Sequence, residues 1–328
     1  MLTVFVIGSN SFSGASFANY ALEKGARVIG ISRSQEPISA FLPYKWASHR
    51  SFSFSQLDLN QDMPSITALI QAERPEYVVN FAAQSMVGES WQKPGDWFLT
   101  NAVSTIKLHD ALRQCEFLRR YVHISTPEVY GSCSGFVKED CPFNPSTPYA
   151  VSRAAADLSL RTFRTAYNFP VVTTRAANVY GPGQQLYRII PRTILFILLN
   201  RKLQLHGGGH STRSFIHIRD VSEATWRIML NGIIGDTYHI STDQVISIRE
   251  LVEKICLKLG ARFEDQVESV GERMGKDSAY HLDSSKLRTE LNWSDSIDLD
   301  RGIDDCIEWV KENFEALKSE PVNYIHKP

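Results

Sequence analysis

Short runs of apolar and β-branched residues alternate with helix-length segments over more than half of this chain. The runs lie at 3–8, 26–32, 52–59, 76–83, 120–125 and 170–177. A short buried strand followed by a helical segment is a βαβ unit, and repeated units build a parallel sheet with helices on both faces. The pattern therefore predicts an α/β fold with a doubly wound parallel sheet.

The alternation changes after about residue 178. Turn-rich loops occupy 180–185 and 206–214, the stretch 215–221 predicts one more strand leading into a helix, and later helices are expected near 247–259 and 300–317. A chain of 328 residues exceeds one ordinary core. We therefore expect two units. The large α/β domain would comprise 1–177 and 215–240, and a smaller α/β lobe would comprise 178–214 and 241–328.

The composition excludes several classes of protein. Apolar residues make up 43% and charged residues 22%, and the net charge is -1, so nothing favours nucleic acid or a membrane surface as a partner. The longest apolar run, 194–200, is too short for a transmembrane helix, which needs roughly 20 residues. The N-terminal run reads as a strand rather than a signal peptide, so we expect a cytoplasmic protein. Five scattered cysteines without CxxC spacing favour reduced thiols. The histidines have no cysteine or carboxylate cluster around them, so we expect no metal.

The first strand ends in GSNSFSG, residues 8–14. A glycine-permitted turn that leads into a helix N-terminus offers free backbone N–H groups and a positive dipole end to a pyrophosphate. This is the fingerprint of the dinucleotide-binding Rossmann fold, with Ser11 where a glycine is expected. The residues of the turn that we expect to contact a cofactor are Gly8, Asn10, Ser11, Phe12 and Gly14.

The second strand ends at Ser32 and Arg33. A protein that binds NAD usually places a carboxylate here for the ribose 2′-hydroxyl. An arginine beside a hydroxyl better suits a 2′-phosphate, so we expect NADP, with NAD as the alternative.

A second group of polar residues follows the strand at 120–125. Ser125, Thr126 and Glu128 lie where ligands bind in open α/β sheets, at the carboxyl end of a strand. The later segment TPYAVSRAAAD, 147–157, predicts a helix with Tyr149 four residues before Arg153. At this spacing both side chains share one helix face, so the cation can lower the pKa of the tyrosine and make it a usable base.

Eight ordered segments resemble the extended short-chain dehydrogenase/reductase family, most closely its nucleotide-sugar 4,6-dehydratases. They are GSNSFSG, LDL at 57–59, NFAAQS at 80–85, STPEVYG at 125–131, YAVSR at 149–153, RAANVYGPGQ at 175–184, TRSFIHIRDV at 212–221 and GKDSAYHLDSSKL at 275–287. The family normally has lysine where this chain has Arg153.

The resemblance implies a chemistry for these side chains. Thr126 and Tyr149 would face the C4 hydroxyl of a sugar, and Tyr149 would take its proton while the C4 hydride moves to the nicotinamide. Glu128 would remove the C5 proton as water leaves C6, and the hydride would return to C6. Dehydratases of the dTDP-glucose type carry an aspartate where this chain has Pro127. The GDP-mannose type has no aspartate at that position, and in this respect this chain is similar to the GDP-mannose type.

Further binding roles are implied by the same resemblance. The cofactor would be held by Asp58 and Leu59 near the adenine, by Ala82 and Ala83 along the adenosine and pyrophosphate, by Ala176 at the nicotinamide amide, and by Tyr149 and Arg153. The substrate, a nucleotide-diphosphate hexose, would be bound by Gln84, Ser85, Thr126, Asn178, Arg188, Arg213, Arg273 and Tyr280. The family usually pairs through helices at about 95–114 and 148–167, so a homodimer is expected.

Other functions remain open on the sequence. A nucleotide-sugar 4-epimerase, decarboxylase or 4-keto reductase shares most of these motifs. A nucleotide-sugar-binding protein without turnover is a further alternative, since Ser11, Pro127 and Arg153 all depart from the family pattern.

Overall fold

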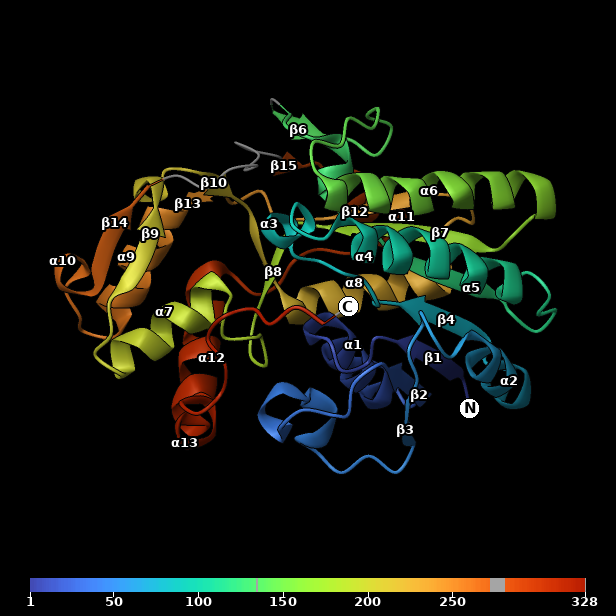
Figure 1. Ribbon diagram of the computed structural model, residues 1–328, viewed down its shortest axis with the longest axis horizontal. Coiled ribbons are helices and arrows are strands. Elements are labelled where there is room, and N and C mark those ends of the chain that lie inside the picture. Colours follow the sequence, from blue (N-terminus) through green and yellow to red (C-terminus); the bar gives the residue numbers. More distant parts are fainter. Residues whose placement is uncertain (134, 272–280, 328) are drawn as a thin grey trace.

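The computed structural model describes residues 1–133, 135–271 and 281–327. Its centre is a seven-stranded parallel sheet with the order β12-β7-β5-β4-β1-β2-β3 (Figure 1). The prediction of a doubly wound parallel sheet is confirmed. The order changes direction between β1 and β4, which is where such sheets bind ligands. The strands are β1 (Thr3–Ile7), β2 (Arg27–Ser32), β3 (Phe52–Gln56), β4 (Tyr77–Asn80), β5 (Arg120–Ile124), β7 (Val171–Ala176) and β12 (Thr237–Ile240).

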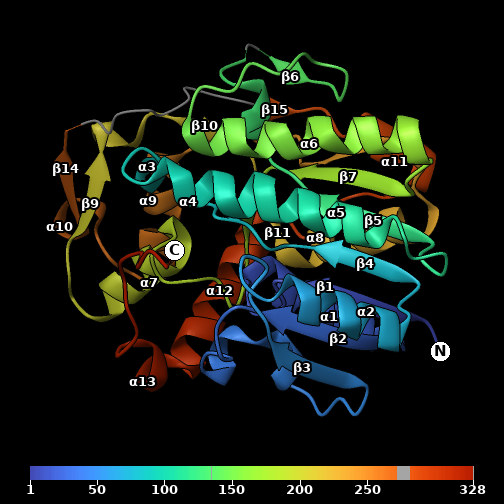
Figure 2. The ribbon, with the colours of Figure 1, turned by 45° about the vertical axis from the view of Figure 1, so that its right-hand side comes forward.

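The side chains of β1 show how both faces of the sheet are covered. Val4 and Val6 pack with α1 (Phe12–Glu23) and α8 (Ile218–Asn231) on one face. Phe5 and Ile7 point to the other face. That face is covered by α2 (Met63–Glu73), α5 (Thr105–Leu112) and α6 (Pro148–Tyr167), and Figure 2 shows α5 and α6 side by side. All four β1 side chains are fully buried, so this strand joins two apolar cores.

The helix α6 has well-defined ends. The hydroxyl of Thr147 accepts a hydrogen bond from the backbone N–H of Ala150 at 3.1 Å, and Pro148 occupies the first helical position. Asn168 ends the helix in the left-handed region at φ 52°. Beside α6, the helices α4 (Pro94–Phe98) and α5 are joined by a π-helical segment, η3 (Leu99–Ser104).

A second core lies beside the sheet. It joins α7 (Ile189–Leu198), α9 (Ile248–Lys258) and α12 (Leu299–Glu312) through buried Ile194, Leu251 and Ile303. The helices predicted near 247–259 and 300–317 are present, the second as α12 followed by α13 (Phe314–Leu317). Four short strand pairs lie outside the central sheet: β6 (Phe136–Val137) with β15 (His281–Leu282), β8 (Asn178–Tyr180) with β11 (Phe215–His217), β9 (Leu203–His206) with β14 (Val267–Val270), and β10 (Thr212–Arg213) with β13 (Ile246–Ser247). The other helices are α3 (Val87–Ser90), α10 (Phe263–Gln266) and α11 (Ser285–Leu291). The 3-10 turns are η1 (Ser39–Phe41), η2 (Pro43–Lys45), η4 (Pro127–Tyr130) and η5 (Gly207–Gly209).

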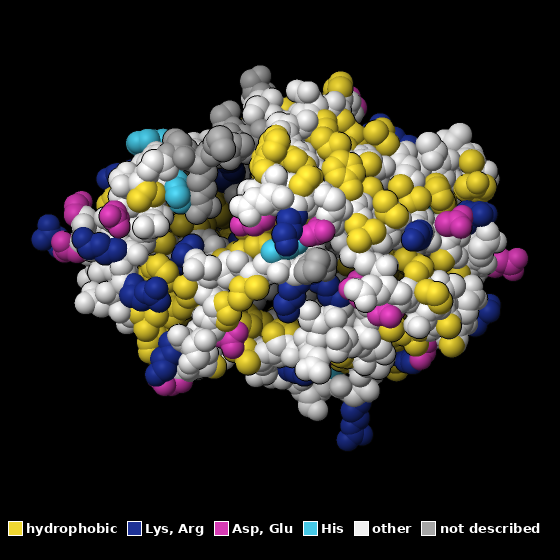
Figure 3. Space-filling model, viewed as in Figure 1, with side chains coloured by type: hydrophobic (Ala, Val, Ile, Leu, Met, Phe, Trp, Pro, Cys, Tyr) yellow, Lys and Arg dark blue, Asp and Glu magenta, His cyan; other side chains and the backbone are white. Residues whose placement is uncertain are grey.

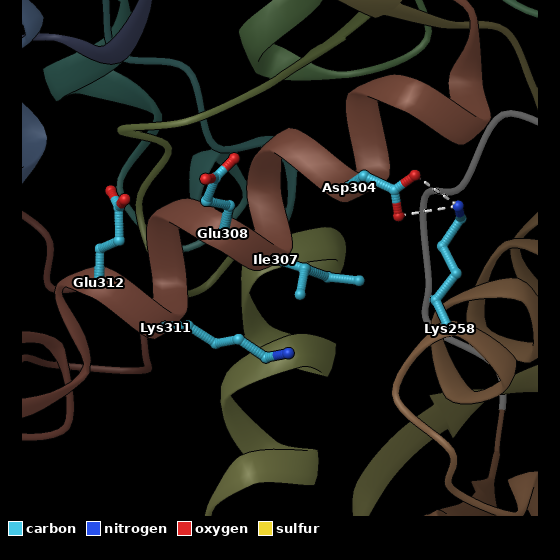
Figure 4. Close-up of a pocket in the computed structure, with 6 residues that line it drawn as sticks. All are labelled: Lys258, Asp304, Ile307, Glu308, Lys311 and Glu312. Atoms are coloured by element: carbon cyan, nitrogen blue, oxygen red, sulfur yellow. Dashed lines mark hydrogen bonds and ion pairs between the residues drawn. The ribbon is translucent and has the colours of Figure 1, made fainter.

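Ion pairs join α9 to α12 on the surface of this second core. Lys254 contacts Asp300 at 2.9 Å, and Lys258 contacts Asp304 at 2.8 Å. Figure 4 shows Lys258 reaching Asp304 across a shallow hollow between the helices. The carboxylates are more than half exposed, so these pairs contribute only about 0–1 kcal/mol each. Among the described helices, none combines the length and apolar content that crossing a bilayer requires.

Candidate active site

The turn after β1 requires its two glycines. Gly8 has φ 81°, and a Cβ there would lie 2.7 Å from the backbone nitrogen of Ala82. A Cβ on Gly14 would lie 2.2 Å from the carbonyl oxygen of Gly8. The turn therefore fits closely between the N-terminus of α1 and the segment after β4, at the carboxyl edge of the sheet.

Ser11 serves this turn without the conformational freedom of glycine. Its backbone is extended, at φ -74° and ψ 157°, which any residue adopts. Its hydroxyl donates to the Gly8 carbonyl at 2.7 Å and accepts from the Gly14 N–H at 3.1 Å, so Ser11 caps α1. Phe12 is buried in the core, which leaves its backbone as the part that can face a ligand. The N–H of Asn10 donates to the Ser32 hydroxyl at 2.9 Å and ties the turn to the end of β2.

The other residues expected at the cofactor follow the ends of neighbouring strands. Arg33 follows β2, and its Nη1 donates to the carbonyl oxygen of Lys327 at 2.9 Å. An oxygen of the Asp58 carboxylate accepts from the N–H of Asn60 at 2.8 Å, so Asp58 shapes its own turn. Leu59 is buried in a core cluster. The half-buried alanines are Ala82 and Ala83 after β4 and Ala176 at the end of β7.

The structure brings Thr126, Glu128 and Tyr149 together. Thr126 precedes the turn η4, and its hydroxyl accepts from the N–H of Glu128 at 3.3 Å and also hydrogen-bonds Tyr149. Burial raises the pKa of Tyr149, and the nearby carboxylate of Glu128 raises it further. The pKa of Tyr149 is lowered by the charges of Arg153 and Arg188 and by the hydrogen bond with Thr126. Arg153 thus lowers the pKa of Tyr149, as the four-residue spacing predicts, but burial and Glu128 outweigh it and the net shift is upward.

Arg153 lies one helical turn after Tyr149 on α6, with only 5% of its surface exposed. Its Nη2 donates to the carbonyl oxygen of Ile124 at the end of β5. Its Nε is buried and has no hydrogen-bond partner within the part of the chain that the structure describes. A buried donor at the carboxyl edge of the sheet, close to Tyr149, suits a ligand hydroxyl such as those of a ribose.

A buried polar network holds the Thr126–Glu128 loop from both sides. Asp157 accepts from the Ser125 hydroxyl at 2.7 Å and from Nη2 of Arg175 at 2.6 Å. Nη1 of Arg175 donates to the Tyr130 hydroxyl at 2.6 Å, and that hydroxyl contacts Nε2 of His239 at 2.8 Å. No motif in the sequence indicates Asp157, Arg175 or Tyr130 for this role, although Asp157 follows Arg153 at the same four-residue spacing.

The residues expected at the substrate are only partly gathered. Arg188 directly precedes α7 and lies close enough to Tyr149 to lower the pKa of the tyrosine. Gln84 is 1% exposed, and its Nε2 donates to the Lys327 carbonyl at 2.6 Å. Ser85 is exposed, and Asn178 lies in β8. Nη1 of Arg213 donates to the Thr212 carbonyl at 2.7 Å. Two expected residues, Arg273 and Tyr280, lie outside the described residues.

The residues present fit a nicotinamide dinucleotide. The glycine turn and the α1 N-terminus face the switch point of the sheet, and the unpartnered Nε of Arg153 lies near Tyr149. Within the described residues, no group of three or more His, Cys, Asp or Glu side chains could hold a metal ion. A Rossmann sheet with a buried tyrosine, a cation four residues later and a threonine at the adjacent strand end defines an extended short-chain dehydrogenase/reductase.

Within this class, the chain belongs to the GDP-mannose 4,6 dehydratase family, whose model matches residues 5–306. A dTDP-glucose 4,6-dehydratase of Xanthomonas campestris is 31% identical over 95% of this chain and 94% of its own length. The crystal structure of the dTDP-glucose 4,6-dehydratase DesIV of Streptomyces venezuelae, which contains NAD, has a TM-score of 0.89 at 28% identity and covers 96% of this chain and 98% of that one. A UDP-glucuronic acid 4-epimerase of Bacillus cereus, with UDP-glucuronic acid and NAD, has a TM-score of 0.84 at 27% identity and covers 95% and 99%.

Proposed function

We propose that this chain is a nucleotide-sugar 4,6-dehydratase. The observation that carries the proposal is the position of Glu128, whose carboxylate acts on Tyr149 strongly enough to be the second cause of its raised pKa. An epimerase needs only reversible oxidation at C4 and has no use for a second base in this place. A dehydratase needs a base at C5, which is a neighbour of C4 in the sugar ring.

The described side chains divide the work as follows. Thr126 and Tyr149 hold the C4 hydroxyl, and the Tyr149 phenolate takes its proton, supported by the charges of Arg153 and Arg188. A dinucleotide held by the Gly8 turn and Arg153 would supply the hydride acceptor for C4 and the hydride donor for C6. Glu128 then removes the C5 proton, which the C4 ketone has made acidic. Because Pro127 replaces a second acid, Glu128 also passes this proton to the C6 hydroxyl, which leaves as water, and Tyr149 returns its proton to C5.

We infer that the dinucleotide is NAD rather than NADP. NAD is the cofactor in the dehydratase structure described above. The expectation of NADP rested on Arg33, whose guanidinium donates to the Lys327 carbonyl. Competition between the two dinucleotides for the purified protein tests this choice. A tighter complex with NADP would reverse it.

The substrate is a nucleoside-diphosphate hexose, with dTDP-glucose as the first candidate because dTDP-glucose dehydratases are the relatives at about one-third identity. Arg188 lies near Tyr149 and can donate to the diphosphate through its planar guanidinium. Arg213 lies in β10, in a segment that resembles a phosphate-binding segment of the family.

We also propose that two copies pair through α4, α5 and α6. Apolar side chains gather on this side of the molecule, where Figure 3 shows a broad yellow area over these helices. An exposed apolar patch of this kind is typical of a subunit interface. The exposed apolar side chains along α4, η3 and α6 are Phe98 (37%), Leu99 (43%), Val103 (46%), Val151 (40%), Leu158 (49%) and Tyr167 (53%). Sedimentation of the purified protein and of Leu158→Glu tests this pairing, since a monomeric parent would exclude it.

A substrate panel tests the activity. The purified protein with NAD is given dTDP-, GDP-, UDP- and CDP-hexoses, and the products are identified by NMR and by loss of water in mass spectrometry. We expect a 4-keto-6-deoxy sugar from one of them. Glu128→Gln should stop the loss of water while leaving oxidation at C4, seen as reduced dinucleotide. A 4-epimer as the only product would favour the epimerase instead, and full dehydration by Glu128→Gln would remove Glu128 from the mechanism.

A further inference from the structure

The last described segment, residues 321–327, crosses from the second core to the carboxyl edge of the sheet. Val322 packs against the second core, and the side-chain oxygen of Asn323 accepts from Nη2 of Arg192 on α7 at 2.9 Å. Figure 1 shows the red end of the chain running from α13 past α7 towards α1 and α4. The segment thus connects the two parts of the molecule on the side where the dinucleotide turn lies.

One carbonyl oxygen of this segment bridges two strand ends. The oxygen of Lys327 accepts from Nε2 of Gln84 at 2.6 Å and from Nη1 of Arg33 at 2.9 Å. Gln84 follows β4 and Arg33 follows β2, and these strands are the two neighbours of β1 in the sheet. An atom bonded to both lies over the end of β1, where the Gly8 turn and the start of α1 are. The Lys327 ammonium also contacts the Ser34 hydroxyl at 3.3 Å.

The segment is anchored away from the groups that face the dinucleotide. Nε2 of His326 contacts the Asp96 carboxylate at 2.7 Å, and its ring stacks on Trp97 with centroids 4.9 Å apart and planes inclined by 12°. Trp97 is fully buried, so this anchor rests on a fixed part of α4. On the other side, the ring of Tyr324 packs edge-on against Tyr187 at 5.5 Å.

We propose that residues 321–327 are a strap that forms the outer wall of the dinucleotide site, and that His326 is the positioning residue that holds it closed. This proposal depends on the part of the proposed function that has the protein bind a dinucleotide. It lies over the turn that would hold the pyrophosphate, so it opens when a dinucleotide enters or leaves. A reaction that returns its hydride within one turnover does not need the dinucleotide to leave, so a closed strap slows exchange without slowing the chemistry.

The rate of dinucleotide release tests the strap. Protein loaded with labelled NAD is chased with excess unlabelled NAD, and the loss of label is followed over time. We expect His326→Ala and a chain ended after Glu320 to release NAD about tenfold faster, equivalent to about 1.4 kcal/mol of lost retention. Asp96→Asn should act in the same direction. The control is Asp110→Asn, which removes an ion pair between Asp110 on α5 and Arg113 just after it and should leave the release rate unchanged.

A second variant separates the anchor from general packing. His326→Phe keeps an aromatic ring for Trp97 and loses the contact with Asp96, so its release rate should lie between those of the parent and His326→Ala. Urea unfolding of each point variant is the control for a general loss of stability. We expect the unfolding transition to match that of the parent. A variant that shifted both the transition and the release rate would owe its faster release to lower stability.

The outcomes distinguish the strap from the proposed function. If the parent binds NAD and both the shortened chain and His326→Ala release it at the parental rate, the strap is wrong and the proposed function stands. If these changes weaken the binding of the nucleotide sugar alone, the segment is a wall of the substrate site and the strap is again wrong. If the parent binds no dinucleotide, the proposed function fails and the strap fails with it.

Discussion

Replacing Asp157 with asparagine removes the charge at the centre of the buried network. The Asp157 side chain is 2% exposed and that of Arg175 is 1% exposed, with 2.6 Å between the carboxylate and Nη2. His123 lies 3.3 Å from the other carboxylate oxygen. Asparagine keeps the size and one acceptor oxygen but leaves the Arg175 cation buried without a counter-charge.

The expected loss of stability is large. Removing one partner of a buried ion pair costs about 3–5 kcal/mol, because the remaining charge is still desolvated. Burial acts to raise the pKa of Asp157, but Arg175 and His123 outweigh it and hold the pKa below its usual range. A carboxylate with a depressed folded-state pKa stabilises the protein above its unfolded pKa of about 3.9. The cost of Asp157→Asn is therefore complete at neutral pH and decreases as the pH falls below about 4.

Urea unfolding at neutral pH measures this cost. Asp110→Asn is the matched control, since the Asp110 side chain is 62% exposed and its pair with Arg113 contributes at most about 1 kcal/mol. Activity provides a second reading, because Asp157 also holds Ser125 beside the Thr126–Glu128 loop. If both variants lost the same small free energy of unfolding, the network would not be a main support of the active-site loop.

Two further predictions concern charged and titrating side chains. Arg153→Lys should lower kcat/KM about tenfold, because the compact ammonium cannot reproduce the guanidinium, whose Nη2 bonds the Ile124 carbonyl while its Nε has no partner among the described residues. A gain in steady-state turnover would mean that arginine is a handicap. Burial lowers the pKa of His217 to about 4, so between pH 4 and pH 6.5 the unfolded chain binds a proton that the folded chain does not, and stability rises with pH by up to about 1.4 kcal/mol per pH unit. His217→Asn keeps a cap for α8 and should reduce the slope in urea unfolding by this contribution. Burial also lowers the pKa of His109, His123 and His239, so these residues keep the remaining slope, and exposed His210→Asn should leave the slope unchanged.

The sequence predicted the sheet well where strands are apolar and flanked by helices. The strand β12 (Thr237–Ile240) was not predicted, because its run TYHI is not continuously apolar and it owes its place in the sheet to pairing with β7. The strand expected at the start of 215–221 exists as β11, but it pairs with β8 outside the central sheet. Strand existence follows from local pattern, whereas the choice of partner depends on contacts between distant segments.

The active-site motifs were predictable for a similar reason. Two short segments contain these residues, Thr126 with Glu128 and Tyr149 with Arg153. The spacing within each segment indicates which side chains lie close together. The net pKa shift of Tyr149 was not predictable, because the extent of its burial is set by the whole fold. The contact of Arg33 with Lys327 joins residues 294 positions apart, and no local pattern reports such a contact.

The length of α6 is constrained more strongly than its composition. Tyr149, Arg153 and Asp157 follow one another in four-residue steps along its buried side, while Val151 and Leu158 are exposed. Each residue turns an α-helix by about 100°. A one-residue insertion or deletion between 149 and 157 would rotate Tyr149 relative to Arg153 and Asp157 and misalign the outer apolar surface at the same time. A change of length at this place would therefore disturb the buried tyrosine, the buried ion pair and the exposed apolar surface together, whereas the exchange of one side chain changes only one of them.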